Sequence, residues 1–224
     1  GASKIHLTVL KFSASASTGY TFGGVEINNG SSTTTIATAD ITSKTYTLTS
    51  NVTITPIWTP NTYNITYNTN GGTGATNTTY NVESATITLP TAPTKIGYTF
   101  AGWYNNANLT GDKVTQVAKG STGNKTFYAK WTPTTYNITY NNLYGTTHSN
   151  PLTYTIETNT ITFSAPTTER KGYAFNGWTP TSIAKGSTGN KTITAQWKAK
   201  TYIVTLDPQG GFSGSNSINA TYNA

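Results

Sequence analysis

Two glutamate–lysine pairs occur at matching places in the chain and are the first candidates for chemistry. Glu83 closes the segment Tyr-Asn-Val-Glu and Glu157 closes Tyr-Thr-Ile-Glu, while Lys125 and Lys191 follow matching Gly-Asn steps. Such a pair could form a covalent Lys–Asn crosslink, with the glutamate as the catalytic acid. The simpler interpretation is an exposed ion pair worth under about 1 kcal/mol. We favour the ion pair.

Trp103 and Trp178 are candidates for ligand stacking, because an exposed indole ring stacks well on the face of a sugar. On a regular strand Trp103 points away from Tyr98 and Phe100, unless Gly102 forms a β-bulge that turns the ring inward. Large aromatic side chains dominate the burial of small modules. We therefore favour a core role for both tryptophans over carbohydrate binding.

The sequence offers little else for catalysis or for metal binding. The chain has 7 acidic residues, no Cys and no His-Glu-x-x-His motif. Zinc sites and hydrolytic triads need such groups in clusters, and calcium needs clustered oxygen ligands. We expect no enzymatic activity, no cofactor and no metal.

The formal net charge of +7 does not predict a nucleic-acid partner. Arg170 is the single arginine, and the lysines are spread thinly along the chain. Nucleic-acid-binding proteins instead gather Lys and Arg on one face. The charge is suited to solubility, and a mildly basic surface could also attract anionic cell-wall polymers or host glycans.

Internal repetition is the main signal in this sequence. Gly-Tyr-Thr-Phe-Ala-Gly-Trp at 97–103 returns as Gly-Tyr-Ala-Phe-Asn-Gly-Trp at 172–178 and, in weaker form, at 19–24. Ala-Lys-Gly-Ser-Thr-Gly-Asn-Lys-Thr at 118–126 returns unchanged at 184–192. Each unit closes on a tryptophan, and these lie 73 and 66 residues apart: Trp58, Trp131 and Trp197. Such periodicity is typical of tandem modules.

The elements that carry these motifs have the pattern of β-strands. Tyr63, Ile65 and Tyr67 alternate with polar residues, and residues 136–140 repeat this alternation. Prolines at 90, 93 and 166 exclude a long helix after the second strand. The sequence predicts a mainly β protein with little helix, built from modules of about 66–73 residues.

The repeat divides the chain into four predicted segments. Residues 1–60 form a divergent or truncated first repeat, residues 61–133 and 134–199 form two full repeats, and residues 200–224 begin a further, truncated one. We call these the first region, the second repeat, the third repeat and the last segment. We expect the chain to be an excerpt from a longer protein.

The Gly-Tyr-Thr-Phe-Ala-Gly-Trp box, the Asn-Gly-Gly turn at 70–72, the Ala-Pro-Thr-Lys segment at 92–95 and the closing tryptophan resemble the Listeria-Bacteroides repeat, also found as the internalin B repeat. The resemblance covers the second and third repeats well and the two ends poorly. It implies a β-grasp-like module, strung in tandem on bacterial surface proteins, without catalytic residues. The third repeat departs from the pattern at Asn141-Asn142-Leu143-Tyr144, where the double glycine is lost.

Short connections suggest that neighbouring modules support each other. A module of this size is marginally stable alone. Only four residues separate Trp131 from Tyr136, a link of roughly 15 Å at full extension that proline stiffens. We expect a semi-rigid rod.

These observations predict a structural spacer, or stalk, of an extracellular bacterial cell-surface adhesin. The alternative is that the modules themselves bind a glycan, a cell-wall polymer or a host protein, or self-associate into a fibre through exposed strand edges. No segment is long and apolar enough for a membrane span in this fragment.

Overall fold

The computed structural model describes residues 3–6, 16–41, 45–207, 209–211, 214 and 217–222. Strands and turns make up almost all of them, and the helical content of this described part is the single 3-10 turn η2 (Thr38–Asp40). The prediction of a mainly β protein with little helix is therefore confirmed. The β-grasp assignment and the rod stay predictions.

The chain forms two compact units. The first comprises Gly1–Thr94 and Phe100–Lys130, and the second comprises Lys95–Thr99 and Trp131–Ala224. A short segment that includes the start of strand β9 (Tyr98–Tyr104) thus belongs with the third repeat rather than with its own repeat. Gly97 and Tyr98 are hydrogen-bonded to Thr134 and Glu157 of the third repeat, which accounts for this division.

The first region contains two small antiparallel sheets. One pairs β1 with β4, and the other has the order β3-β2-β5. The buried core of the larger sheet consists of Val25, Ile27 and Ile36. The strands are β1 (Ser3–His6), β2 (Tyr20–Asn28), β3 (Thr33–Ala37), β4 (Thr45–Leu48) and β5 (Thr53–Pro60).

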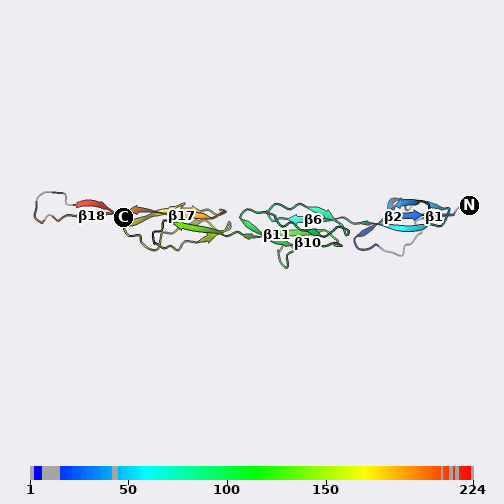
Figure 1. Cartoon of the computed structure of the whole chain (residues 1–224), viewed down its shortest axis with the longest axis horizontal. Helices are drawn as coiled ribbons and strands as arrows, with labels where there is room; N and C mark the ends of the chain where they lie inside the picture. Colours follow the sequence, from blue (N-terminus) through cyan, green and yellow to red (C-terminus); the bar gives the residue numbers. More distant parts are fainter. Residues whose placement is uncertain are drawn as a thin grey trace. The chain divides into compact units, whose positions relative to one another are not determined.

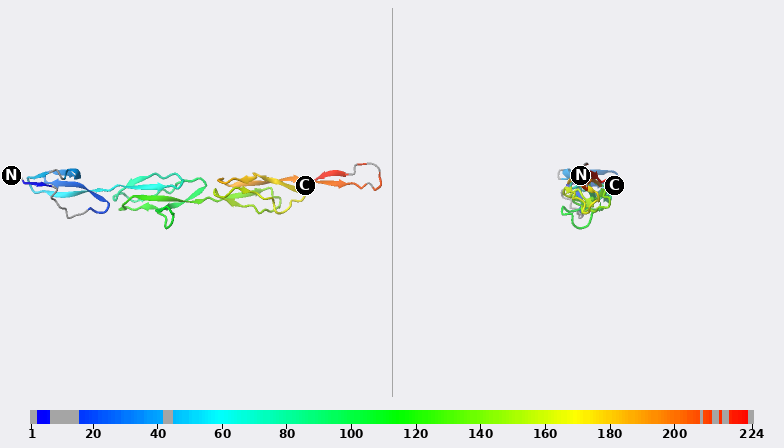
Figure 2. Two further views of the ribbon diagram at one scale, coloured as in Figure 1. Left: turned by 180° about the vertical axis from the view of Figure 1, so that it is seen from behind. Right: turned by 90° about the vertical axis from the view of Figure 1, so that its left-hand side faces the viewer.

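The second repeat is built on a mixed four-stranded sheet of order β7-β6-β11-β9 (Figures 1 and 2). Its central pair, β6 and β11, consists of the first and last strands of the repeat, and these two strands are parallel. A small antiparallel pair, β8 and β10, accompanies it. Besides β9, the strands are β6 (Tyr63–Asn68), β7 (Thr78–Tyr80), β8 (Ile87–Thr88), β10 (Gln116–Val117) and β11 (Lys125–Pro133).

The third repeat has the same topology, with sheet order β13-β12-β17-β15 and a small β14-β16 pair. The parallel pair is now β12 and β17, with Ile138 opposite Lys191. The strands are β12 (Tyr136–Asn141), β13 (Thr153–Tyr154), β14 (Ile161–Thr162), β15 (Tyr173–Thr179), β16 (Ser182–Ile183) and β17 (Lys191–Ala199). In the last segment, β18 (Thr201–Thr205) pairs with β19 (Ser217–Thr221) as a hairpin.

The repeated Gly-Asn-Lys loop has the same structural role in both repeats. In the second repeat the Tyr80 hydroxyl donates to the Gly123 carbonyl over 2.6 Å, and the Asn64 peptide N–H donates to Asn124 Oδ1 over 2.9 Å. The equivalent bonds of the third repeat run from Tyr154 to Gly189 and from Asn137 to Asn190. The loop therefore ties the first two strands of each repeat to its last strand.

Candidate functional site

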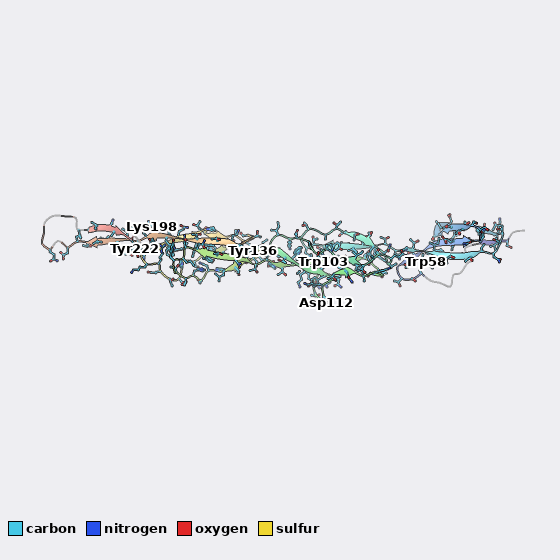
Figure 3. All side chains as sticks on the ribbon, viewed as in Figure 1. Trp58, Trp103, Asp112, Tyr136, Lys198 and Tyr222 are labelled. Atoms are coloured by element: carbon cyan, nitrogen blue, oxygen red, sulfur yellow. The ribbon has the colours of Figure 1, made fainter. Side chains whose placement is uncertain are left out.

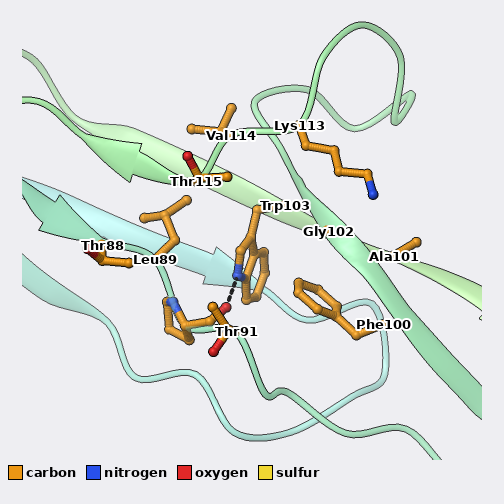
Figure 4. Close-up of a pocket in the computed structure, with 11 residues that line it drawn as sticks. Thr88, Leu89, Thr91, Phe100, Ala101, Gly102, Trp103, Lys113, Val114 and Thr115 are labelled. Atoms are coloured by element: carbon orange, nitrogen blue, oxygen red, sulfur yellow. Dashed lines mark hydrogen bonds between the residues drawn. The ribbon is translucent and has the colours of Figure 1, made fainter.

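Both tryptophans proposed for ligand stacking lie in the cores of their repeats. Trp103 is 2% exposed and Trp178 is 4% exposed. The Trp103 indole N–H donates to the Pro90 carbonyl over 2.7 Å, and its ring lies between Leu89 and Phe100 (Figure 4). The Trp178 N–H donates to the Ser164 carbonyl over 2.8 Å. Rings so deeply buried offer no face to a sugar, and the core role fits this burial.

Backbone irregularity at a glycine turns these rings inward. Gly102 has a φ of +136° and Gly177 a φ of +106°, in the region that favours glycine. In β15 the pairing with β17 shifts register between Phe175 and Trp178, as a β-bulge does. Phe175 and Trp178 then pack on the same side, with ring centroids 5.2 Å apart.

A pocket of about 210 Å³ lies beside Trp103. Leu89 and Phe100 contribute its apolar walls, and the aliphatic stem of Lys113 passes Gly102 at its edge (Figure 4). Lys113 belongs to the loop at 105–113, which extends from the second repeat with Asp112 near its outer end (Figure 3). In the third repeat a short connection at 180–181 replaces this loop.

The glutamates and lysines of the two predicted pairs contact other residues. Tyr20 donates its hydroxyl to Glu83, and Lys125 Nζ donates to the Thr122 carbonyl over 3.1 Å. Lys191 lies opposite Ile138 in the parallel ladder. Among the described residues, no ion pair joins either glutamate to its predicted lysine.

Glu83 belongs to a contact that sequence reasoning missed. Within the first unit, the Tyr20 hydroxyl donates to Glu83 Oε1 over 3.1 Å, and the Asn61 peptide N–H donates to the Gly19 carbonyl over 2.8 Å. The Gly-Tyr step at the start of β2 is thus bound both by the link to the second repeat and by the glutamate of that repeat.

The second unit contains the same arrangement. Tyr98 donates to Glu157 Oε1 over 2.9 Å, and the Thr134 peptide N–H donates to the Gly97 carbonyl over 2.9 Å. We call each set a Gly-Tyr contact. It comprises the glycine and tyrosine that open one box, the link residue, and the aliphatic–glutamate pair of the following repeat.

Each Gly-Tyr contact requires glycine, because an aliphatic side chain presses on it. A Cβ built on Gly19 would lie 2.2 Å from Val82 Cγ1, and one built on Gly97 would lie 2.5 Å from Ile156 Cδ1. Both glycines also have positive φ, +91° and +76°. Any larger residue would both strain the backbone and collide with the following repeat.

A partial version of the contact occurs between the third repeat and the last segment. The Lys200 peptide N–H donates to the Gly172 carbonyl over 2.9 Å. Tyr222 lies against Gly172 where an aliphatic residue lies in the other two contacts, and its ring is 5.6 Å from that of Tyr173.

The tyrosines of the two complete contacts are held in their neutral form. The hydrogen bond to Glu157, with desolvation, raises the pKa of Tyr98 above its ordinary value. Desolvation is the larger cause for Tyr20, whose pKa is also raised by the hydrogen bond to Glu83. A neutral phenol can donate to a carboxylate, whereas a phenolate would repel it.

The described residues contain no group of three or more His, Cys, Asp or Glu side chains placed to hold a metal ion. None of their helical segments is long and apolar enough to span a bilayer.

Comparison with known proteins identifies the repeat. The sequence pattern of the Listeria-Bacteroides repeat domain matches residues 63–130 and again 136–206. A "Putative membrane protein" of Evansella cellulosilytica is 28% identical over 184 residues, covering 79% of this chain and 27% of the relative. A "Putative Gly-rich membrane protein" of the same organism is 28% identical over 171 residues, covering 71% of this chain and 19% of the relative.

The chain therefore spans about a quarter or less of the length of these relatives. No solved structure matches it significantly. The two matches of the repeat pattern together cover more than half of the sequence. Tandem repetition, a common sheet topology and this match agree: the chain belongs to the Listeria-Bacteroides repeat domain family.

Proposed function

We propose that this chain is a structural spacer segment of a bacterial cell-surface adhesin, and that it holds another region of the protein away from the cell. The recurrence of the Gly-Tyr contact in both units carries the proposal. The proposed role is mechanical and extracellular, and it assigns no catalytic residue or cofactor. The match to relatives named as membrane proteins supports a place at the cell envelope.

A spacer must resist bending where one repeat meets the next, and the Gly-Tyr contact supplies a physical means. The link residue Thr134 has its peptide N–H bound to Gly97, so the backbone there loses rotational freedom. The Tyr98–Glu157 bond and the packing of Ile156 on Gly97 restrain the same place from two further directions. Three restraints of different kinds at one link favour a stiff connection.

Distance measurement by electron paramagnetic resonance tests this proposal. The chain contains no Cys, so Thr110→Cys and Thr181→Cys, both at exposed positions, would carry the only two spin labels. We expect one narrow distance distribution that broadens in a Gly97→Ala variant. A distribution as broad in the doubly labelled protein that keeps Gly97 as in the Gly97→Ala variant would contradict a stiff spacer.

Surface location needs a separate measurement. Antibodies raised against the chain should label intact cells of the bacterium that produces it, and external protease should remove the label. A signal that appears only after the cells are permeabilised would contradict the extracellular assignment.

A further inference from the structure

Arg170 lies between two aromatic rings in the third repeat. Its guanidinium carbon is 3.8 Å from the ring centroid of Tyr144 and 3.8 Å from that of Tyr173. The Trp197 ring centroid is 5.6 Å away. The only arginine of the chain is thus held by cation–π contacts on the faces of its planar group.

This arrangement leaves the hydrogen-bonding edge of the arginine available. A guanidinium carries five N–H donors, all in its own plane, and rings stacked on its faces accept none of them in that plane. In the described part of the chain, no carboxylate forms an ion pair with Arg170 and no acceptor is found for its side-chain N–H groups. A planar donor edge of this kind suits the two oxygens of a carboxylate.

Arg170 lines a pocket of about 300 Å³. Arg170 and Lys200 supply positive charge to its lining, Glu169 supplies the one carboxylate, and Phe175 and Trp197 supply aromatic rings. These two rings meet edge to face, with centroids 5.4 Å apart, and the Trp197 N–H is already bound to the Asn142 carbonyl over 2.8 Å. The pocket therefore presents ring faces and cations together.

The third repeat has Tyr144 at a turn position where the second repeat has a different residue. Tyr144 and Asn70 occupy equivalent turn positions, each with a φ of +48° and each followed by glycine. Asn70 uses its side chain to donate to the Ala129 carbonyl over 2.7 Å, whereas Tyr144 is 62% exposed. Left-handed backbone is unusual for a bulky residue, and such strain concentrates at functional sites.

We propose that Arg170, Lys200 and the adjoining rings bind a carboxylated sugar of an acidic polysaccharide. The carboxylate takes the donor edge of Arg170 with Lys200 beside it, and the apolar face of the sugar packs on the Phe175 and Trp197 wall. Tyr144 is a positioning residue that fixes the guanidinium plane from the side away from the pocket. The second repeat has Lys95 over Tyr98 at 4.4 Å, which offers a point charge without the planar fork.

Nuclear magnetic resonance titration of the whole chain with a galacturonic acid trimer tests the site. We expect saturable shifts of the Trp197 indole N–H signal, and none of that size with a galactose trimer or with inorganic phosphate. Equal binding of the neutral trimer would overturn the proposal in favour of a plain aromatic surface. Equal binding of phosphate would overturn it in favour of a general anion site.

Variants sharpen the test. Arg170→Lys keeps the charge but loses the fork, so we expect at least a tenfold loss of affinity, with a severalfold loss for Tyr144→Asn. Glu169→Gln should bind more tightly, because it removes the carboxylate that repels the ligand. Lys185→Gln, which removes a charge elsewhere in the same repeat, is the matched control. Unchanged affinity in a folded Arg170→Lys variant would overturn the assignment.

Discussion

The second and third repeats have the same sheet topology but differ in two loops. This difference separates the features that the fold requires from those that it permits. Sheet order, the parallel central pair and the Gly-Asn-Lys loop are the same in both. The second repeat adds the loop at 105–113 and places Lys113 beside Gly102. The third repeat lacks this loop and carries Tyr144 at the turn where the second has Asn70.

The shared features all bind one strand to another, whereas the differing features lie where the chain leaves the sheet. Loops tolerate such change because few backbone hydrogen bonds depend on them. Two copies of one module can therefore keep one sheet topology and still display different surfaces.

Removing the buried tryptophan should have the largest effect, and an equal one in both repeats. Trp103→Ala and Trp178→Ala should each lower the free energy of unfolding by about 3–5 kcal/mol, because each leaves a cavity in a small core. Urea titration followed by resolved amide signals of each repeat would measure this. Thr181→Ala, at an exposed position, is the control, and a loss below about 1 kcal/mol for either tryptophan would contradict its core role.

A substitution at the Gly-Tyr contact should have the second-largest effect on stability. Gly97→Ala should lower the free energy of unfolding by about 2–4 kcal/mol, since positive φ and the collision with Ile156 act together. Gly111→Ala has a similar φ but open space, so about 1 kcal/mol is expected there. Chemical denaturation of both variants measures the difference. Equal losses would mean that the following repeat does not press on Gly97.

Placing each turn residue in the other repeat, as Asn70→Tyr or Tyr144→Asn, should change the stability of the two repeats by different amounts. Asn70→Tyr should destabilise the second repeat by about 1–2 kcal/mol, because the Ala129 carbonyl loses its donor. Tyr144→Asn should change stability by less than about 0.5 kcal/mol, since the lost cation–π contact is offset by the ease with which Asn adopts positive φ. Thermal unfolding of each single variant decides this, and equal effects would make the two turns equivalent.

The smallest effect concerns alkaline pH. The folded-state pKa of Tyr98 is raised above the ordinary value of 10.0, so its contribution to stability is complete below that value and is lost as pH rises through the folded pKa. Burial also raises the pKa of Tyr67, Tyr80, Tyr140 and Tyr154, so the comparison must be made against Tyr98→Phe.

We expect the spin-label distance distribution of the doubly labelled protein that keeps Tyr98 to broaden between pH 9 and pH 12 by more than that of the same protein with Tyr98→Phe. Phenolate absorbance in the ultraviolet would follow the ionisation itself. Identical broadening in both proteins would remove Tyr98 from the pH response.

Sequence reasoning was adequate for features that lie within one repeat. Alternation of apolar residues predicted the strands, and Gly102 was the position considered for a β-bulge that would turn Trp103 inward; its φ is +136°. Both depend on a few consecutive residues. The partners of Glu83 and Glu157 lie one repeat earlier, so comparison of equivalent positions inside a repeat could not find them. The signal available was the joint recurrence of Gly-Tyr and aliphatic-Glu across successive units.

The Arg170 cluster was missed for a different reason. Its residues lie at 144, 170, 173 and 197, and the fold alone brings them together. The loss of the double glycine in the third repeat was visible in the sequence, but it gave no indication of an arginine cluster. The role of Tyr144, at a left-handed turn position, can be inferred only once the structure shows that Arg170 packs on its ring.

The Gly-Tyr contact also bears on how such proteins change in length. It is heterologous, with the box of one repeat meeting the aliphatic–glutamate pair of the next, so every complete repeat carries both halves. A gene duplication that adds one whole repeat therefore adds a ready-made partner on each side, and a deletion rejoins two compatible halves. Recombination within the gene can change the number of repeats without any new interface having to evolve.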